Sequence, residues 1–270
     1  MCRLLVLVTL AACGSTPRAG DGDDAPIDAH AGSNTADAAS PWFDPAATKI
    51  AVEIDYETNQ APFTGAILGF GDTFDVSAAN LARMIGGKKL LELPRTLATM
   101  QDIGVLADEE WTIQDILQLA EAHRDRHDTA DTRSYYIVFV SGHYVQNGTV
   151  MPLILGVSVV GTPIIAMFKD VIRGTGTVLD MNTPRYVEQS TIVHELGHAL
   201  GMVGGAVPTT SNHEDPAHDG HCTNDKCAMY YLNEGASEAT AFATQYLLTK
   251  DSILLGPECL ADLDALTGGP

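Results

Sequence analysis

The sequence predicts an α/β fold in which a sheet packs on helices. Short apolar segments rich in β-branched residues alternate with segments whose apolar residues have helical spacing. Their order is strand, helix, strand, helix, strands and helix, which is typical of a sheet covered by helices. The sequence has no internal repeat.

The first predicted elements alternate between strand and helix. Ile50–Tyr56 alternates apolar and polar residues, which predicts a strand. Val76–Ile85 and Trp111–Arg126 have the helical spacing of apolar residues. Lys89–Leu93 favours a short strand, and the aromatic and β-branched run Tyr135–Val140 predicts a buried strand.

The uncharged stretch Val150–Phe168 approaches the length of a membrane span, which needs about 20 residues. Prolines and glycines interrupt it, and β-branched residues dominate its pieces. These features favour two strands, Leu153–Val160 and Ile164–Phe168, joined by a turn near Gly161 and Thr162.

A long helix is predicted to begin at Thr183-Pro184, because a hydroxyl at the N-cap followed by proline is a good helix start. It should run to about Leu200, with Gly201 as a left-handed terminator. A loop rich in histidine, aspartate, proline and glycine follows, and Glu238–Leu248 predicts a last helix.

The first residues have the features of a secretory signal: the positive charge of Arg3, the short apolar run Leu4–Ala12 and small residues at its end. The ending Leu10-Ala11-Ala12-Cys13 resembles the bacterial lipobox, in which the signal is removed before a cysteine that carries lipid. We therefore expect residues 1–12 to be a signal peptide and Cys13 to be lipidated. The alternative is an ordinary signal with a chance cysteine.

Residues 13–47 are expected to form an acidic, disordered linker, because Gly20–Ser40 lacks Lys and Arg and has almost no aliphatic side chain. About 220 residues remain, so residues 48–270 can bury a domain core. The formal net charge of −20 argues against nucleic acid and anionic membrane surfaces as partners.

His194, Glu195 and His198 form the pattern H-E-x-x-H on the long predicted helix. Residues four apart lie on one helix face, so both imidazoles can bind one zinc ion. Glu195 borders the same cleft, where it can take the proton of a zinc-activated water that attacks a carbonyl. The alternative, a helix with two incidental histidines, is disfavoured by the glycine at 201 and the histidine-rich loop.

His194, Glu195, His198 and Gly201 resemble the start of the metzincin motif H-E-x-x-H-x-x-G-x-x-H. The resemblance implies a twisted mixed sheet packed on helices, an active-site helix ending near 201 and a smaller C-terminal subdomain, residues 202–270. The third histidine of the motif would fall at position 204, which is glycine, so this zinc ligand must come from later in the chain. The candidates are His213, His218 and His221.

The segment His221-Cys222-x4-Cys227-x-Met229 resembles the archaemetzincin pattern H-C-x4-C-x-M. The resemblance implies that His221 is the third zinc ligand and that Met229 forms the turn beneath the metal. Spacing alone does not exclude the two other histidines of the loop as the third zinc ligand.

The archaemetzincin ending C-x-x-C, part of a four-cysteine zinc site in that family, is incomplete here. Cys259 is present, but Asp262 stands in place of the last cysteine. The resemblance therefore puts a structural zinc in doubt and favours a Cys222–Cys227 disulfide. We interpret residues 213–218 as a solvated acidic loop, with a second cation as the alternative.

Tyr231 lies two residues after Met229. In astacins and serralysins a tyrosine at this offset lies near the metal and can stabilise an oxyanion, so the resemblance implies a catalytic role for Tyr231. A packed aromatic side chain is the equal alternative.

Together these patterns predict zinc-dependent hydrolysis of peptide bonds by a monomeric lipoprotein, anchored through Cys13 outside the cytoplasm in a bacterial cell envelope. The metzincin resemblance implies that an extended protein or peptide substrate pairs with an edge strand, Leu153–Val160. The first alternative is a non-catalytic surface binding lipoprotein with a structural zinc, which a fourth protein ligand would favour. The second is a zinc enzyme that acts on another bond.

Overall fold

The computed structural model describes residues 42–67, 71–176, 182–249 and 252–269. The expected signal peptide, Cys13 and the linker up to residue 41 lie outside the described residues. Within the described ranges, no helix combines the length and the apolar character that a membrane crossing needs.

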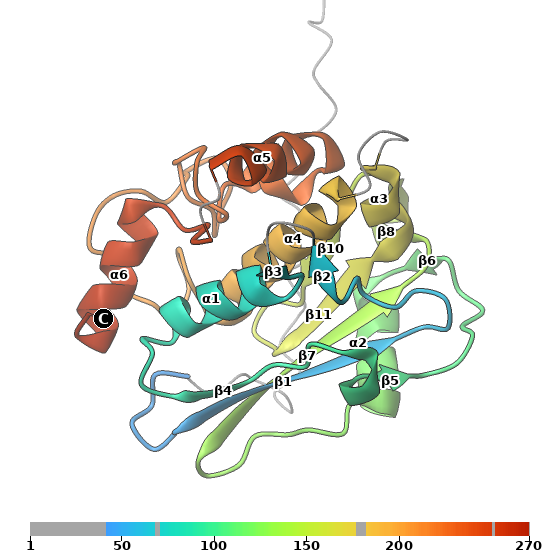
Figure 1. The fold of residues 1–270 in the computed structure, drawn as a ribbon, viewed down its shortest axis with the longest axis horizontal. Coiled ribbons are helices and arrows are strands. Elements are labelled where there is room, and N and C mark those ends of the chain that lie inside the picture. Colours follow the sequence, from blue (N-terminus) through green and yellow to red (C-terminus); the bar gives the residue numbers. More distant parts are fainter. Residues whose placement is uncertain (1–41, 68–70, 177–181, 250–251, 270) are drawn as a thin grey trace, which may run out of the picture.

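A six-stranded mixed sheet forms the centre of the fold (Figure 1). Its strands are β1 (Lys49–Tyr56), β4 (Leu90–Glu92), β5 (Gln101–Asp102), β7 (Thr132–Val140), β10 (Gly156–Ser158) and β11 (Ile164–Phe168). They run in the order β10-β11-β7-β1-β4, and β5 also pairs with β1. All neighbours are parallel except β10 and β11, which are antiparallel.

Helices cover both faces of this sheet. They are α1 (Asp75–Met84), α2 (Ile113–His123), α3 (Lys169–Gly174), α4 (Thr183–Ala199), α5 (Ala236–Thr249) and α6 (Pro257–Thr267), with short 3-10 helices η1 (Leu97–Thr99) and η2 (Tyr231–Glu234). α1, α4 and α5 lie on one side of the sheet and α2 on the other (Figure 1). The polar residues Glu53 and Asp55 of β1 are therefore buried, although the alternation in this segment suggested a polar face.

Two small sheets flank the main one. One contains β6 (Glu110–Trp111), β8 (His143–Gln146) and β9 (Thr149–Met151), and the other contains β2 (Ala66–Ile67) and β3 (Gly71–Asp72). After α4, the described chain adds no strand to any sheet and consists of loops, η2, α5 and α6.

The predicted pair of strands within residues 150–168 is confirmed, with a turn at Gly161, where φ is 76°. β11 has the predicted bounds, but β10 is shorter than predicted. The reason is that residues 153–155 pair with residues 234–236 instead: the amide of Leu155 donates to the carbonyl of Glu234 at 3.2 Å.

The long helix predicted from Thr183 is α4, and it begins one residue earlier than predicted. Asn182 is the N-cap, Thr183 is the first helical residue, and Pro184 lies in the first turn, where its missing N–H needs no acceptor. α4 packs against α1 and α5, so nearly all of its residues before His198 are buried.

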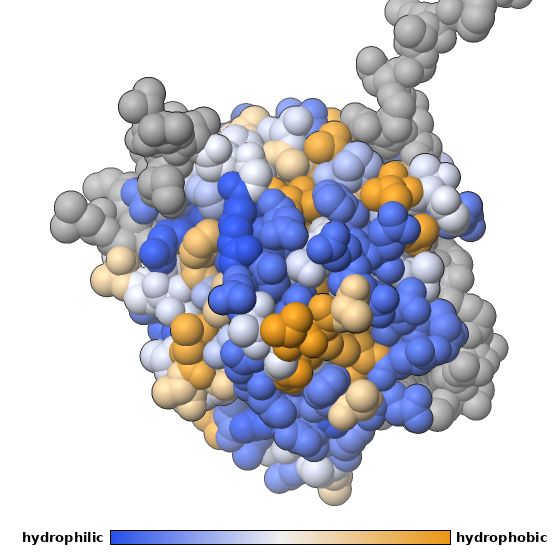
Figure 2. Space-filling model, turned by 90° about the vertical axis from the view of Figure 1, so that its right-hand side faces the viewer, coloured by the Kyte–Doolittle hydropathy of each residue, from blue (hydrophilic) through white to orange (hydrophobic). Residues whose placement is uncertain are grey.

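The surface is mainly hydrophilic on the face drawn in Figure 2, where hydrophobic residues gather in small patches. Large apolar side chains exposed among the described residues are Leu90, Leu97, Val105, Val150, Leu153 and Val160. Two of them, Val150 and Leu153, line a pocket near the candidate site.

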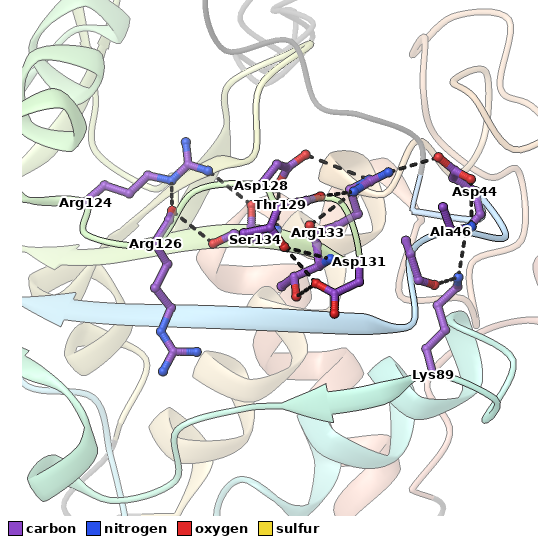
Figure 3. Close-up of polar contacts among 12 residues, drawn as sticks. Asp44, Ala46, Lys89, Arg124, Arg126, Asp128, Thr129, Asp131, Arg133 and Ser134 are labelled. Carbon is purple, nitrogen blue, oxygen red and sulfur yellow. Dashed lines mark hydrogen bonds and ion pairs between the residues drawn. The ribbon is translucent and has the colours of Figure 1, made fainter.

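Residues 42–47, which the sequence assigned to the linker, pack against the domain. Trp42 is buried, and its Nε1 donates to the carbonyl of Leu200 at 2.9 Å. Arg133 Nη2 lies 3.0 Å from Asp44 Oδ2, and Lys89 donates to the carbonyl of Asp44 (Figure 3). The folded part of the chain therefore includes these residues.

Candidate metal centre

α4 positions two of the predicted ligands. His194 and His198 are one helical turn apart, and their Nε2 atoms lie 3.0 Å from each other. Both side chains are nearly buried, with 1% and 8% of their surface exposed. Gly201 then takes a φ of 74°, which glycine adopts without steric cost, and the helix ends.

His221 joins these two histidines from the long loop. Its ring centroid lies 5.4 Å from that of His194 and 4.8 Å from that of His198. The two other histidines that spacing left open lie elsewhere: His213 bonds a carboxylate of α6, and His218 stacks on a tyrosine ring. Of the three, the structure brings only His221 to the pair on α4.

The imidazoles are oriented by backbone carbonyls. Nδ1 of His194 lies 2.6 Å from the carbonyl oxygen of Ala228, and Nδ1 of His221 lies 3.1 Å from that of Asp219. The Nδ1–H of each ring can donate to its carbonyl, so Nε2 is the nitrogen that faces the centre. Burial and the two neighbouring imidazoles lower the pKa of His198 well below its usual value, so His198 is neutral.

Glu234, at the end of η2, is a ligand-type residue that the sequence did not predict. Its Oε1 lies 2.7 Å from Nε2 of His221, 3.5 Å from Nε2 of His194 and 4.0 Å from Nε2 of His198. Although burial raises the pKa of a carboxyl group, hydrogen bonds from His194 and His221 lower that of Glu234 to about 2. The four side chains form a group that could hold a metal ion.

Pairing between distant segments brings Glu234 to the centre. The backbone of Glu234 accepts from Leu155, and Gly235 forms a β-bridge with Ile154. In the sequence, Glu234 has no ligand spacing relative to the histidines. Its position a few residues after Met229 is the one local feature that links it to the site, and this position does not predict a metal ligand.

Glu195 lies where α4 meets the edge strand β10. Its residue is 2% exposed, and a Cβ atom on Gly156 would lie 3.0 Å from its Cγ. Burial lowers the pKa of His194, but the hydrogen bond to Glu234 and the charge of Glu195 raise it above its usual value. The charge of Glu195 therefore acts on His194, its neighbour in the sequence.

Met229 packs against α4 at Gly197, the residue before His198. It is fully buried, and its Sδ fills the space that a Cβ atom on Gly197 would need. The turn is held by hydrogen bonds from the amide of Cys222 to the carbonyl of Met229, at 2.7 Å, and from Tyr230 to Cys227, at 3.0 Å.

The expected Cys222–Cys227 disulfide is absent from the structure. Cys222, Cys227 and Cys259 are free, buried thiols. Cys259 of α6 lies beside the two other cysteines. Cys227 Sγ lies 3.6 Å from Cys259 Sγ, and Cys222 interacts with both of the other thiols.

Tyr231 is placed beside a pocket. Its ring stacks on His218, with ring centroids 3.5 Å apart and an interplanar angle of 4°. It also lines a largely apolar pocket of about 270 Å³, together with residues 149–154, Leu232, Gly235 and Glu238.

The chemistry of the four-residue group fits a divalent ion, because neutral imidazole and carboxylate are both ligands that zinc accepts. No family model, curated protein or solved structure matches the chain. What the group can do therefore follows from its own geometry and from general chemistry.

Proposed function

We propose that this chain is a zinc metallopeptidase. The observation that carries the proposal is the convergence of three buried or nearly buried imidazoles beside Glu195. His194, His198 and His221 would hold the ion through Nε2. Three protein ligands that leave one position for water are typical of catalytic zinc sites.

Each residue of the centre then has a role. Zinc, when bound, polarises a carbonyl and lowers the pKa of a water to about 7. Glu195 accepts the proton of the attacking water and returns it to the leaving amine. The carbonyls of Ala228 and Asp219 fix the rings of His194 and His221, which keeps both imidazoles aimed at one point.

The substrate is proposed to pair with the outer side of β10, the end strand of the main sheet. Gly156 of β10 lies against Glu195, so an extended peptide bound there would pass the centre. The apolar pocket lined by Val150, Leu153 and Tyr231 lies at the same end of the domain and would accept an apolar side chain of the substrate.

The metzincin resemblance supports the same proposal. Gly201 ends α4 in the left-handed conformation, and Met229 lies under Gly197, where the resemblance implies the turn beneath the metal. The mixed sheet packed on helices is compatible with that family. From the signal segment and Cys13 we propose a lipid-anchored protein outside the cytoplasm of a bacterial cell.

A non-catalytic zinc-binding lipoprotein is the second candidate, and Glu234 favours it. As a fourth ligand, the carboxylate of Glu234 would close the site to water. The backbone of residues 234–236 pairs with residues 153–155, so this segment occupies part of the sheet edge beside the centre.

Metal analysis and digestion of a peptide library by the full chain distinguish the two candidates. A peptidase should lose cleavage on chelation and regain it with zinc. In Glu195→Gln, cleavage should fall by about 100-fold or more with zinc retained. Glu121→Gln makes the same change on the exposed side of α2 and should leave cleavage unaltered. A parent chain that holds zinc and cleaves no peptide supports the second candidate.

A further inference from the structure

A second group of ligand-type side chains lies outside the candidate centre. Cys222, Cys227 and Cys259 are fully buried, and His213 is 3% exposed. The ligand atoms of His213, Cys222 and Cys259 lie within 4.8 Å of one another. Cys227 Sγ is 3.6 Å from Cys259 Sγ, and its thiol also interacts with Cys222.

The spacing of the sulfur atoms matches a tetrahedral zinc site. With Zn–S distances near 2.3 Å, tetrahedral geometry places two sulfurs about 3.8 Å apart, close to the 3.6 Å between Cys227 and Cys259. Cys222 interacts through hydrogen bonds with both Cys227 and Cys259, so the three sulfur atoms lie together. The amide of Asn224 adds a bond to Cys222 Sγ at 3.4 Å.

His213 is held as a metal-binding imidazole is held. Its Nε2 bonds Asp262 Oδ2 at 2.6 Å, and Asp262 is itself fixed by the amide and hydroxyl of Thr210, at 2.5 and 2.7 Å. The other nitrogen, Nδ1, is buried and has no hydrogen-bond partner among the described residues, while the ring interacts with Cys222. A carboxylate on one imidazole nitrogen commonly orients the other nitrogen toward a metal.

The four residues come from three segments that no sheet joins. His213 belongs to the loop after α4, Cys222 and Cys227 frame the turn before Met229, and Cys259 lies on α6. The loop and the turn meet at one β-bridge, between Glu214 and Cys222. A bound ion would cross-link all three segments where regular secondary structure does not.

We propose that His213, Cys222, Cys227 and Cys259 bind a second zinc ion in a closed, structural Cys3His site. His213 takes the place of the missing fourth cysteine, and Asp262 orients it. Because Cys222 directly follows His221, this ion would also hold His221 in position at the candidate centre. The proposal does not depend on peptide hydrolysis.

Zinc content of the purified full chain tests the proposal. We expect about two zinc ions per chain in the parent and about one in His213→Ala and in Cys259→Ser. His218→Ala is the matched control, because it removes an imidazole from the same loop that stacks on Tyr231, and it should keep both ions. The double variant His194→Ala/His198→Ala should lose only the ion of the candidate centre.

Cobalt substitution provides a readout that does not need the cysteine variants to fold. In the double variant His194→Ala/His198→Ala, bound cobalt should give thiolate-to-cobalt charge-transfer absorption in the near ultraviolet. Three thiols should become reactive only after chelation. A disulfide among residues 222, 227 and 259 in the chain as isolated, or a cobalt spectrum without thiolate absorption, would overturn the proposal. The presence or absence of peptide cleavage has no bearing on either result.

Discussion

The Sδ atom of Met229 lies against the backbone of Gly197, in the space that a Cβ atom would need. The contact joins the turn that follows Cys227 to α4, at the residue before His198. Alanine favours helices by about 1 kcal/mol over glycine, yet overpacking a buried contact costs about 1–3 kcal/mol. The structure therefore requires glycine at this helical position.

We expect Gly197→Ala to lower the free energy of unfolding by up to about 2 kcal/mol, since the clash outweighs the gain in helix propensity. Zinc affinity should fall as well, because Met229 or α4 must move. Urea denaturation and zinc titration measure both effects. Gly174→Ala is the control, because that glycine has open space around its Cβ position. Equal stability of Gly197→Ala and the parent would show that the contact is not tight.

The carboxylate of Glu234 is predicted to restrain the centre. In Glu234→Gln, a weaker ligand replaces a carboxylate that lies within 4.0 Å of Nε2 of all three histidines. We expect zinc to remain bound with lower affinity and peptide cleavage to rise severalfold, because water gains the fourth position. Steady-state kinetics with zinc in excess measure the change. A loss of cleavage with zinc bound would instead assign Glu234 a role in the reaction.

Asp55 is predicted to make stability depend on pH. It is 1% exposed, accepts a hydrogen bond from the hydroxyl of Tyr136 at 3.0 Å, and burial raises its pKa from 3.8 to about 7. The folded state therefore binds the proton more tightly than the unfolded state. The stability from this proton is fully present below about pH 4 and is lost as the pH rises to 7.

Asp55→Asn should remove this dependence, because an amide stays neutral and its oxygen can accept from Tyr136. The variant should be more stable than the parent at pH 8 by a few kcal/mol, at about 1.4 kcal/mol per pKa unit, and equally stable near pH 4. Denaturation at both pH values measures the difference. Asp108→Asn, at an exposed position, should show no such crossover.

Leu153 is predicted to contribute to substrate selection. It lines the apolar pocket and is 47% exposed, so Leu153→Ser should cost little stability. We expect KM to rise for peptides with a bulky apolar side chain near the cleaved bond, and to change little for peptides with small side chains. A matched peptide series tests this, and an equal effect on both groups would argue against the pocket.

The sequence by itself determined the local elements and the first part of the site. The spacing of His194 and His198 places both on one face of a helix, because a turn of helix depends only on residues near in the chain. The same holds for β1, β7 and the hairpin turn at Gly161. α6 was not predicted, although Pro257 in its first turn and Gly268 at its end are local helix signals.

Only the tertiary structure decided which residues join that helix face. Spacing left three histidines open, and the return of the loop brought His221 to the centre and His213 to the cysteines. Backbone pairing with residues 153–155 places Glu234 at the centre. α6 places Cys259 beside the two other cysteines, and the three are free thiols in place of the expected disulfide. These contacts join segments far apart in the chain, and their choice depends on which packing buries the whole core, which a local pattern cannot specify.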